Sequence, residues 1–232
     1  MLTFEKPLVK GFFIKREKRF FARIQLIDGN EVHCYCPNTG RMTGLLIPGA
    51  VCWIREQPVH CKLRFAWELV TLESGLACVN THRANDLLAS ESGNVPLSWS
   101  YPYYLFKREP VVGSHRFDLE LIHQTGKRVL VEIKTVTLQK AQKGYFPDAP
   151  SKRAHKHLKT MIDLVDKGMA CWLVFVVMVP EVNQVFPAFW IDPLFTSLMK
   201  DAENRGVKIL AFTSSITPNS IKLGRQIPVL SG

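Results

Sequence analysis

One stretch constrains the fold of this chain more than any other: residues 129–136, which read VLVEIKTV. Apolar residues fall on both faces of the extended strand that this pattern predicts, as in a central strand covered on both sides. Glu132 and Lys134 interrupt the pattern on the face that they share with Leu130 and Val136. Because an unpaired buried charge is costly, these two residues should either pair with each other or hold a metal ion.

Helices and strands alternate from residue 81 onward, which predicts an α/β (α+β) domain. Residues 171–179 are apolar on both faces and are a second candidate for a central strand. Ser151 and Asp192 are suited to cap helices that run to about residues 167 and 205, and another helix is expected at about 81–90. The remaining strands are expected at residues 103–107, 116–122 and 127–137, with 207–213 as the final strand.

The first 80 residues have a different pattern, in which short strands are separated by turn residues such as Asp28-Gly29-Asn30. Strands are expected at residues 19–27, 31–36, 50–55, 67–72 and 76–79. Several short strands without a long helical pattern favour a small closed barrel such as an OB-fold. We therefore expect an OB-like β-barrel domain at 1–80 and an α/β domain at 81–232.

The chain is basic, with 30 Lys+Arg against 20 Asp+Glu and a formal net charge of +10. Such a charge attracts polyanions, so nucleic acid is the first partner to consider, while a basic surface that only keeps the protein soluble explains the charge equally well. The longest apolar run, residues 170–180, is shorter than a membrane span of roughly 20 residues. With no apolar signal region at the amino terminus, we expect no membrane association and a cytoplasmic location.

The six cysteines include no CxxC pair, and most of them have apolar or strand-like neighbours. We expect buried, reduced thiols. His33, Cys34 and Cys36 suggest a metal site, but zinc sites place paired ligands around a turn, and no second pair follows. A structural metal is therefore not expected.

Cations and phenylalanines alternate at the start of the barrel region, where Arg16 and Arg19 are candidate phosphate ligands. Rings beside cations are typical of barrels that bind single strands, although paired phenylalanines in a strand more often belong to a core. This feature leaves an RNA partner open as well as DNA. The phenylalanines concerned are Phe4, Phe12, Phe13, Phe20 and Phe21.

Residues 36–44 read CPNTGRMTG, a turn made of residue types that adopt special backbone dihedrals. Its amides could converge on an anion, with Arg41 as the accompanying cation. A tight turn between strands explains every residue except Arg41 equally well.

Asp118 precedes Glu132 by a spacing that lets two neighbouring strands bring both carboxylates together. With Lys134 one strand period further on, the three residues form a plausible Mg²⁺ site: the carboxylates hold the ion, and the ammonium orients a water or stabilises a transition state. An ordinary surface ion pair is the alternative, because D…ExK is a short pattern with many chance matches.

Downstream, Ser151 opens a helix whose first turns carry cations, where the helix dipole would favour acids. A bound phosphate would resolve this conflict, since free amides, dipole and side chains all favour it. A solvated polar face is the alternative reading. The candidate phosphate ligands are Lys152, Arg153 and Lys156.

At these residues the chain resembles the sugar fermentation stimulation protein A (SfsA) family. The stretches that carry the resemblance follow in the same order over nearly the whole chain. They are CPNTGRM at 36–42, VNTHRAN at 79–85, VEIKTVTL at 131–138, GYFPDA at 144–149 and KHL at 156–158, together with Arg116–Asp118.

The resemblance implies an OB-like amino-terminal domain followed by a restriction-endonuclease-like, PD-(D/E)xK domain with a central mixed sheet. It also implies DNA binding without strong sequence preference and a link to sugar (maltose) metabolism in bacteria. By the nuclease pattern, Asp118 and Glu132 match the acids that bind Mg²⁺ or Mn²⁺, and Lys134 matches the catalytic lysine. Relatives add a glutamate from the first helix where Ser90 stands here, and whether Glu91 replaces it is open.

Three functions remain compatible with these residues. The first is a DNA-binding protein with a phosphodiesterase site, and the second is an active Mg²⁺- or Mn²⁺-dependent nuclease acting on DNA or RNA. The third is a catalytically silent regulatory module, in which the charged residues serve structure alone. The sequence gives no indication of the oligomeric state.

Overall fold

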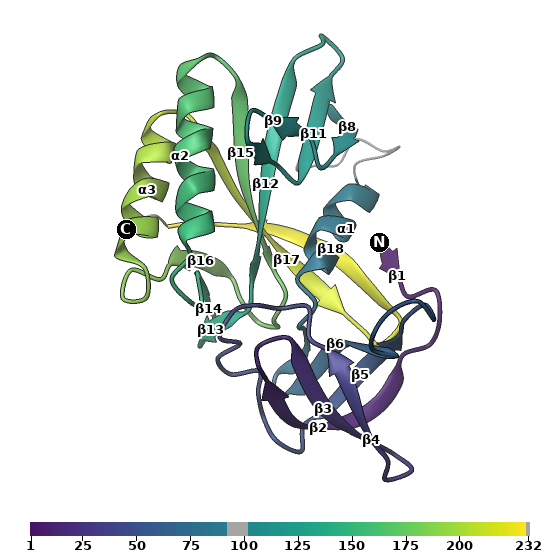
Figure 1. Cartoon of the computed structure of the whole chain (residues 1–232). Coiled ribbons are helices and arrows are strands. Elements are labelled where there is room, and N and C mark those ends of the chain that lie inside the picture. The colour runs from purple at the N-terminus through teal and green to yellow at the C-terminus, as the bar shows by residue number, and fades with distance from the viewer. Residues whose placement is uncertain (92–101, 231–232) are drawn as a thin grey trace.

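The computed structural model describes residues 1–91 and 102–230, and its first part is a small β-barrel (Figure 1). The barrel closes because β4 pairs with β6 in parallel, in addition to the antiparallel pairs around the ring. Its core includes Phe13, which stacks on Trp67 with ring centroids 4.7 Å apart. The strands are β2 (Val9–Glu17), β3 (Phe21–Leu26), β4 (Glu31–Tyr35), β5 (Val51–Glu56), β6 (Phe65–Leu72) and β7 (Gly75–Cys78).

The rest of the chain is organised around a seven-stranded mixed sheet in the order β1-β18-β17-β15-β12-β11-β8. The parallel strands β12, β15 and β17 form its centre, and the other strands pair antiparallel. Its strands are β1 (Leu2–Thr3), β8 (Tyr103–Arg108), β11 (Leu119–His123), β12 (Arg128–Val136), β15 (Ala170–Val177), β17 (Lys208–Ile216) and β18 (Ser220–Ile227).

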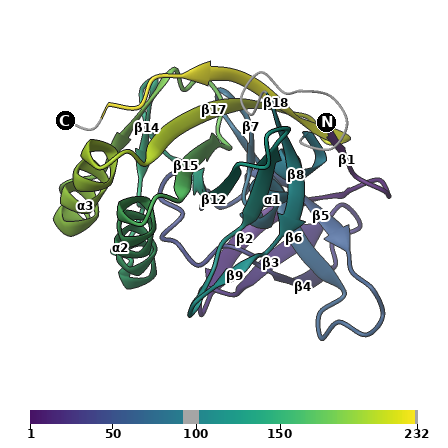
Figure 2. The same cartoon turned by 90° about the horizontal axis from the view of Figure 1, so that it is seen from above.

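Three helices cover the two faces of this sheet (Figure 2). α1 (His82–Glu91) packs on one face, where it meets Val131 and Ile133 of β12. α2 (Lys152–Asp166) and α3 (Pro193–Asn204) pack on the other face, in the core cluster that includes Leu130 and Val136. The alternation predicted for residues 129–136 is thus confirmed. No helix among the described residues is long and apolar enough to cross a membrane.

Two small sheets complete the architecture. β9 (Val111–Val112) pairs with β10 (His115–Arg116). β14 (Lys143–Phe146) lies between β13 (Leu138–Lys140) and β16 (Gln184–Pro187), pairing antiparallel with the first and parallel with the second.

Several predicted elements differ from the structure. Residues 207–213 are not the final strand, because β18 follows; its polar residues and Gly224 hide the strand pattern. The strand β2, which pairs with both β3 and β5, was not predicted. The expected strand 116–122 is interrupted at Phe117 and Asp118, so Phe117 packs in the α2 core while Leu119 packs in the α1 core. Finally, β1 pairs with β18 and not with the barrel.

The cysteines are free thiols, and all but Cys61 are buried, as predicted. Burial raises the pKa of Cys52 and of Cys171 to about 12, so these groups are neutral.

A buried carboxylate joins the barrel to α1. Glu68 of β6 has no exposed surface, and Arg83 of α1 donates to both of its oxygens at 2.8 and 2.9 Å. Arg55 donates to Oε1 at 2.8 Å and Asn80 to Oε2 at 2.9 Å. Four hydrogen bonds thus compensate the desolvation of this charge, and they fix α1 against the barrel.

The turn at residues 36–44 makes a second contact between the two parts. Asp148 Oδ2 accepts from the backbone N–H of Met42 at 3.0 Å, and Asn38 Oδ1 accepts from that of Gly40 at 2.9 Å. These amides are therefore occupied by side chains of the protein, and the tight-turn interpretation is the correct one for them. The Arg16 guanidinium donates to the carbonyls of Asn38, Gly40 and Arg19, which fastens the turn to the β2–β3 hairpin.

Gly40→Ala is expected to destabilise this contact, because a Cβ at residue 40 would overlap the Asp148 carboxylate. Moving the carboxylate would break its hydrogen bond with Met42, so we expect a loss of about 1–3 kcal/mol in the free energy of unfolding, measured by urea denaturation. Thr39→Ala, at an exposed neighbour, is the control. In a protein that already carries Asp148→Ala, Gly40→Ala should lower the free energy of unfolding by less. An unchanged loss would show that the overlap with the Asp148 carboxylate is not its cause.

Asp192 caps α3 and also anchors the start of α2. Its carboxylate accepts from the N–H groups of Phe195 at 3.0 Å and Ser151 at 2.9 Å, and it contacts His155 Nε2 at 2.7 Å. Burial alone would raise the pKa of Asp192, but these hydrogen bonds outweigh burial and lower it.

Asp192→Asn keeps a good helix-capping residue but removes the charge and one of the two acceptor oxygens, so it tests the connection between α2 and α3. Because the pKa of Asp192 is lower in the folded state, the charge contributes stability above a pH of about 4, and this contribution is lost as the pH falls through the folded pKa. We expect the variant to be less stable than the wild type at pH 6 and the difference to narrow below pH 4. Urea denaturation across this range would measure it, and a constant difference would contradict the prediction.

Candidate functional site

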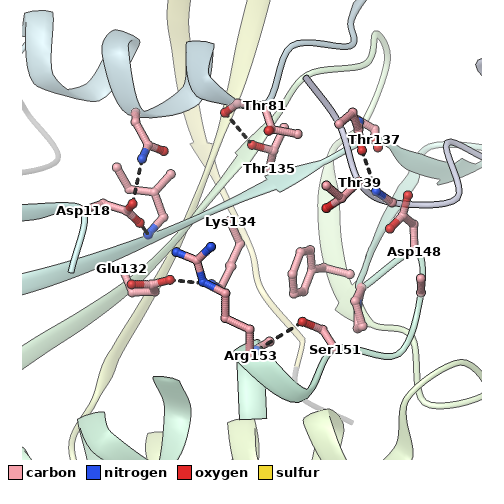
Figure 3. Close-up of a pocket in the computed structure, with 18 of the residues that line it drawn as sticks. Thr39, Thr81, Asp118, Glu132, Lys134, Thr135, Thr137, Asp148, Ser151 and Arg153 are labelled. Carbon is pink, nitrogen blue, oxygen red and sulfur yellow. Dashed lines mark hydrogen bonds and ion pairs between the residues drawn. The ribbon is translucent and has the colours of Figure 1, made fainter. Parts of the chain in front are cut away.

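A cleft of about 460 Å³ lies between the barrel and the larger domain (Figure 3). The barrel contributes Arg19 and the turn at residues 38–40, and α1 contributes His82 and Asn85. The opposite wall is formed by β12, by residues 145–150 and by the first turn of α2. Because the two walls come from different parts of the chain, the docking of barrel and domain determines the shape of the cleft.

Asp118 lies where the chain enters β11. β11 and β12 are antiparallel, and their first pair is Leu119 with Val131. Asp118 precedes Leu119 and Glu132 follows Val131, so these two residues lie opposite each other. Its Oδ2 accepts from the N–H of Ile133 at 2.7 Å, and its Oδ1 accepts from the amide of Asn85 at 2.7 Å. Burial and then the neighbouring Glu132 charge raise the pKa of Asp118 to about 6.

Glu132 lies deeper, with 4% of its side chain exposed. Lys134 Nζ donates to its Oε1 at 2.5 Å, and His157 Nδ1 on α2 contacts the same oxygen. Burial favours the neutral acid, but the Lys134 charge and the contact with His157 outweigh it and lower the pKa of Glu132. The carboxylate is therefore held ionised within the sheet.

The second oxygen of Glu132 tests whether this site fits a cation. Glu132 Oε2 is buried and has no hydrogen-bond partner among the described residues. A carboxylate oxygen in that state is costly unless a cation or a water satisfies it. Together with Asp118 it offers an all-oxygen donor set, which suits a hard cation such as Mg²⁺ or Ca²⁺.

The set of protein ligands is small. Among the described residues, no group of three or more His, Cys, Asp or Glu side chains is placed to hold a metal ion. Two carboxylates still fit Mg²⁺, which usually keeps several waters. Ser90 is exposed, and its hydroxyl donates to Leu87 O at 2.8 Å. Among the described side chains of α1, Asn85 is the one that donates to Asp118. Glu91 is the last residue of α1, and its side chain lies outside the described ones.

The predicted phosphate ligands differ in their position relative to the cleft. Arg153 lines the cleft opposite Arg19, and Figure 3 shows its side chain in the cleft with Lys134 and Glu132. Lys152 and Lys156 are exposed in the first turns of α2, which contain no acidic residue. No ion pair engages these three α2 cations within the described part of the chain. Arg41 is exposed beside the cleft turn.

Arg16 has another role. Each of its terminal nitrogens donates to a backbone carbonyl, at 2.7 Å for Gly40 and 2.7 Å for Arg19. Its donors are therefore engaged in the fold, and the structure gives no support for Arg16 as a phosphate ligand. Among the barrel phenylalanines, Phe13 belongs to the core, whereas Phe12, Phe20 and Phe21 are exposed.

Two residues of the site were missed by sequence reasoning. His157 follows the cation Lys156 in the sequence, yet it lies on the buried side of α2 with Ala154, Leu158 and Met161. The available signal was its place in that apolar stripe, where a polar residue needs a partner. Asn85 gave no such signal, because it faces Asp118 only through tertiary packing.

Two family models match the chain in succession. The model described as the SfsA N-terminal OB domain matches residues 14–79, and the one described as the sugar fermentation stimulation protein RE domain matches residues 82–220. They agree with the barrel and the mixed sheet, so the predicted OB-like and restriction-endonuclease-like fold is confirmed.

A solved structure is similar over the full length. The structure of Pyrococcus furiosus SfsA in complex with Ca²⁺ has 26% sequence identity and a TM-score of 0.90, with 99% of each chain covered. A repair endonuclease from Pyrococcus abyssi has 13% identity and a TM-score of 0.32, covering 88% of this chain and 87% of that one. EndoMS in a complex with double-stranded DNA has 14% identity and a TM-score of 0.35, covering 92% and 90%. The last two similarities are too low to support a structural argument.

Proposed function

The chain belongs to the sugar fermentation stimulation protein family, and we propose that it binds the DNA backbone in the cleft and holds a divalent cation at Asp118 and Glu132. The observation that carries the proposal is the buried Glu132 Oε2, which has no hydrogen-bond partner in the described part of the chain and lies in a cleft with Arg19 and Arg153 on its walls. A cation at the carboxylates would satisfy that oxygen. The phosphates of a nucleic acid would in turn neutralise the arginines.

The metal part of the proposal rests on the donor set. Asp118 and Glu132 would hold Mg²⁺ or Mn²⁺, which would neutralise charge on a phosphate and lower the pKa of a bound water. The similar structure from Pyrococcus furiosus is a complex with Ca²⁺, a hard cation with the same preference for oxygen. His157 and Lys134 keep Glu132 ionised, so the site has negative charge before any metal arrives.

The DNA part rests on the start of α2. Free backbone amides, the positive end of the helix dipole and the side chains of Lys152, Arg153 and Lys156 all favour a phosphate there. Arg19 approaches from the barrel wall, so one strand could be held from both sides. Contacts of this kind go to the phosphates, which carry no sequence information, and this supports binding without strong sequence preference.

We also propose that the site hydrolyses the DNA strand that it binds. Lys134 stands beside Glu132 in the same cleft, where its ammonium could orient a water or stabilise charge on the phosphate oxygens. A catalytically silent binding module is the second candidate, favoured by the small number of carboxylates at the site. The cytoplasmic location, an RNA partner and the link to sugar metabolism stay predictions.

Binding can be tested with a labelled blunt duplex by fluorescence anisotropy over a range of salt concentrations. The logarithm of the binding constant should fall by about 0.9 per phosphate contact for each tenfold rise in salt. Arg153→Ala should lower both the affinity and this slope, whereas Lys222→Ala on β18, at the far end of the sheet, should not. Undetectable binding or salt-independent binding would refute the proposal.

Hydrolysis is tested with linear, supercoiled and single-stranded DNA in Mg²⁺ or Mn²⁺. Divalent-dependent cutting that is lost in both Asp118→Asn and Lys134→Ala would support the enzyme. Intact binding without cutting by the wild type would favour the silent module.

A further inference from the structure

A group of exposed aromatic rings lies next to the cleft, in the turn between β16 and α3. Phe189 and Trp190 are 63% and 53% exposed, high values for large rings of this kind. The two rings meet edge to face with centroids 5.3 Å apart. Two adjacent exposed rings form a surface that the fold itself does not need for its core.

This aromatic surface is continuous with the cleft. Trp190 meets the ring of Tyr145 at 4.8 Å, and Tyr145 lines the cleft. Tyr145 in turn stacks on Phe186, its partner across β14 and β16, at 5.7 Å. Rings therefore run without interruption from the cleft wall to the exposed turn.

The turn is held rigidly beside the basic start of α2. Ala188 N donates to Phe146 O at 2.8 Å, and the Ser151 N–H donates to Asp192 Oδ2 at 2.9 Å. Lys152 and Arg153 directly follow Ser151. These hydrogen bonds connect the aromatic turn to the start of α2, so the fold fixes the distance between the rings and the α2 cations.

A cation lies beside these rings: Lys143 Nζ is 5.2 Å from the centre of the Phe186 ring. The carboxylate of Asp192 in the same turn is buried and caps α3. Rings beside cations are the combination by which proteins bind unpaired strands: bases stack on the rings while the cations hold the phosphates.

From this arrangement we propose that the surface formed by Tyr145, Phe189 and Trp190 stacks the unpaired bases of a DNA strand that leaves the cleft. The inference rests on the proposed DNA binding and extends it. The preferred ligand is then a duplex with a single-stranded extension, whose paired part lies against α2 and whose first free bases reach Trp190.

The test compares a blunt duplex, the same duplex with a short thymidine extension, and one whose extension is abasic. Anisotropy is measured for the wild type, Trp190→Ala, Trp190→Phe and Leu194→Ala. We expect Trp190→Ala to weaken binding of the thymidine extension about tenfold, within the range for loss of one stacked base. Binding of the blunt and abasic ligands should change less than twofold.

The other variants separate stacking from general apolar contact. Trp190→Phe retains a ring and should lose less than Trp190→Ala. Leu194→Ala removes exposed apolar surface without a ring, from a residue 50% exposed nearby in the chain, and should have no effect. Phe189→Ala is a second ring variant, and thermal unfolding of each protein checks that the fold persists.

Several outcomes would overturn the inference. Equal losses on blunt and extended ligands, or unchanged binding by Trp190→Ala, would show that the rings do not stack on bases. A change in oligomeric state on substitution, measured by sedimentation, would assign the surface to a second copy of the chain. If the wild type binds the blunt duplex but gains nothing from an extension, only this inference fails; if it binds no duplex, the proposed function fails first.

Discussion

Asp118→Asn is expected to weaken the binding of Mn²⁺ or Ca²⁺ by about 100-fold or more, measured by isothermal titration calorimetry. Substituting groups that only orient metal ligands typically costs 10- to 100-fold in affinity, and Asp118 would be a ligand itself. The change removes one of two carboxylates that face the cleft and keeps the shape of the side chain. Asparagine can still accept from the Ile133 N–H, so the local fold should persist.

Glu120→Gln is the matched control for this experiment. Glu120 is also buried and lies two residues away on β11, but it pairs with Arg128 at 3.1 Å and does not line the cleft. Its substitution should leave metal affinity within a factor of about two or three, as expected for a site without a ligand role. Equal affinities of Asp118→Asn and the wild type would place the cation elsewhere.

Arg83→Met is expected to lower the free energy of unfolding by about 3 kcal/mol, the lower end of the cost of breaking a buried ion pair, because Arg55 still pairs with Glu68. Glu68 is fully buried, and Arg83 supplies two of its four hydrogen bonds. Methionine keeps much of the side-chain volume, so the loss reports the ion pair and not a cavity. Urea denaturation monitored by circular dichroism would measure it.

Two comparisons make this prediction specific. Arg64→Met removes an exposed ion pair with Glu56 and should change stability by less than about 1 kcal/mol. Replacing Glu68 and Arg83 together by methionine should cost less than Arg83→Met alone, since no charge is then left buried. If the double variant lost as much unfolding free energy as the two single variants together, the buried Glu68 charge would not be the reason that Arg83→Met is unstable.

Much of the fold followed from local patterns. The caps Ser151 and Asp192 were predicted because a polar residue precedes an apolar stripe at each position, and both accept from helix amides in the structure. β18 was missed because only two of its eight residues are buried, so its sequence lacks the apolar residues of a strand that is covered on both faces. β2 was missed because its cations resemble those of a surface loop.

The site was only partly predictable. The expected pairing of Glu132 with Lys134 follows from strand periodicity, since residues two apart share a face. The break at Phe117, which orients Asp118, could not be read from the alternation of residues 116–122. The roles of Arg16 and Asp148 depend on carbonyls and amides of the turn at 38–42, whose position is set by the whole barrel.

Local sequence patterns were thus sufficient to predict the two parts of the fold, the charged strand β12 and the basic start of α2. These depend on periodicity and capping, which act over a few residues. The sequence did not predict that His157 and Asn85 reach the two carboxylates or that Trp190 stands next to the cleft. Nor did it predict that one oxygen of Glu132 has no partner among the residues that the structure describes. These features arise from contacts between residues far apart in the chain, whose geometry is set by packing and not by local sequence.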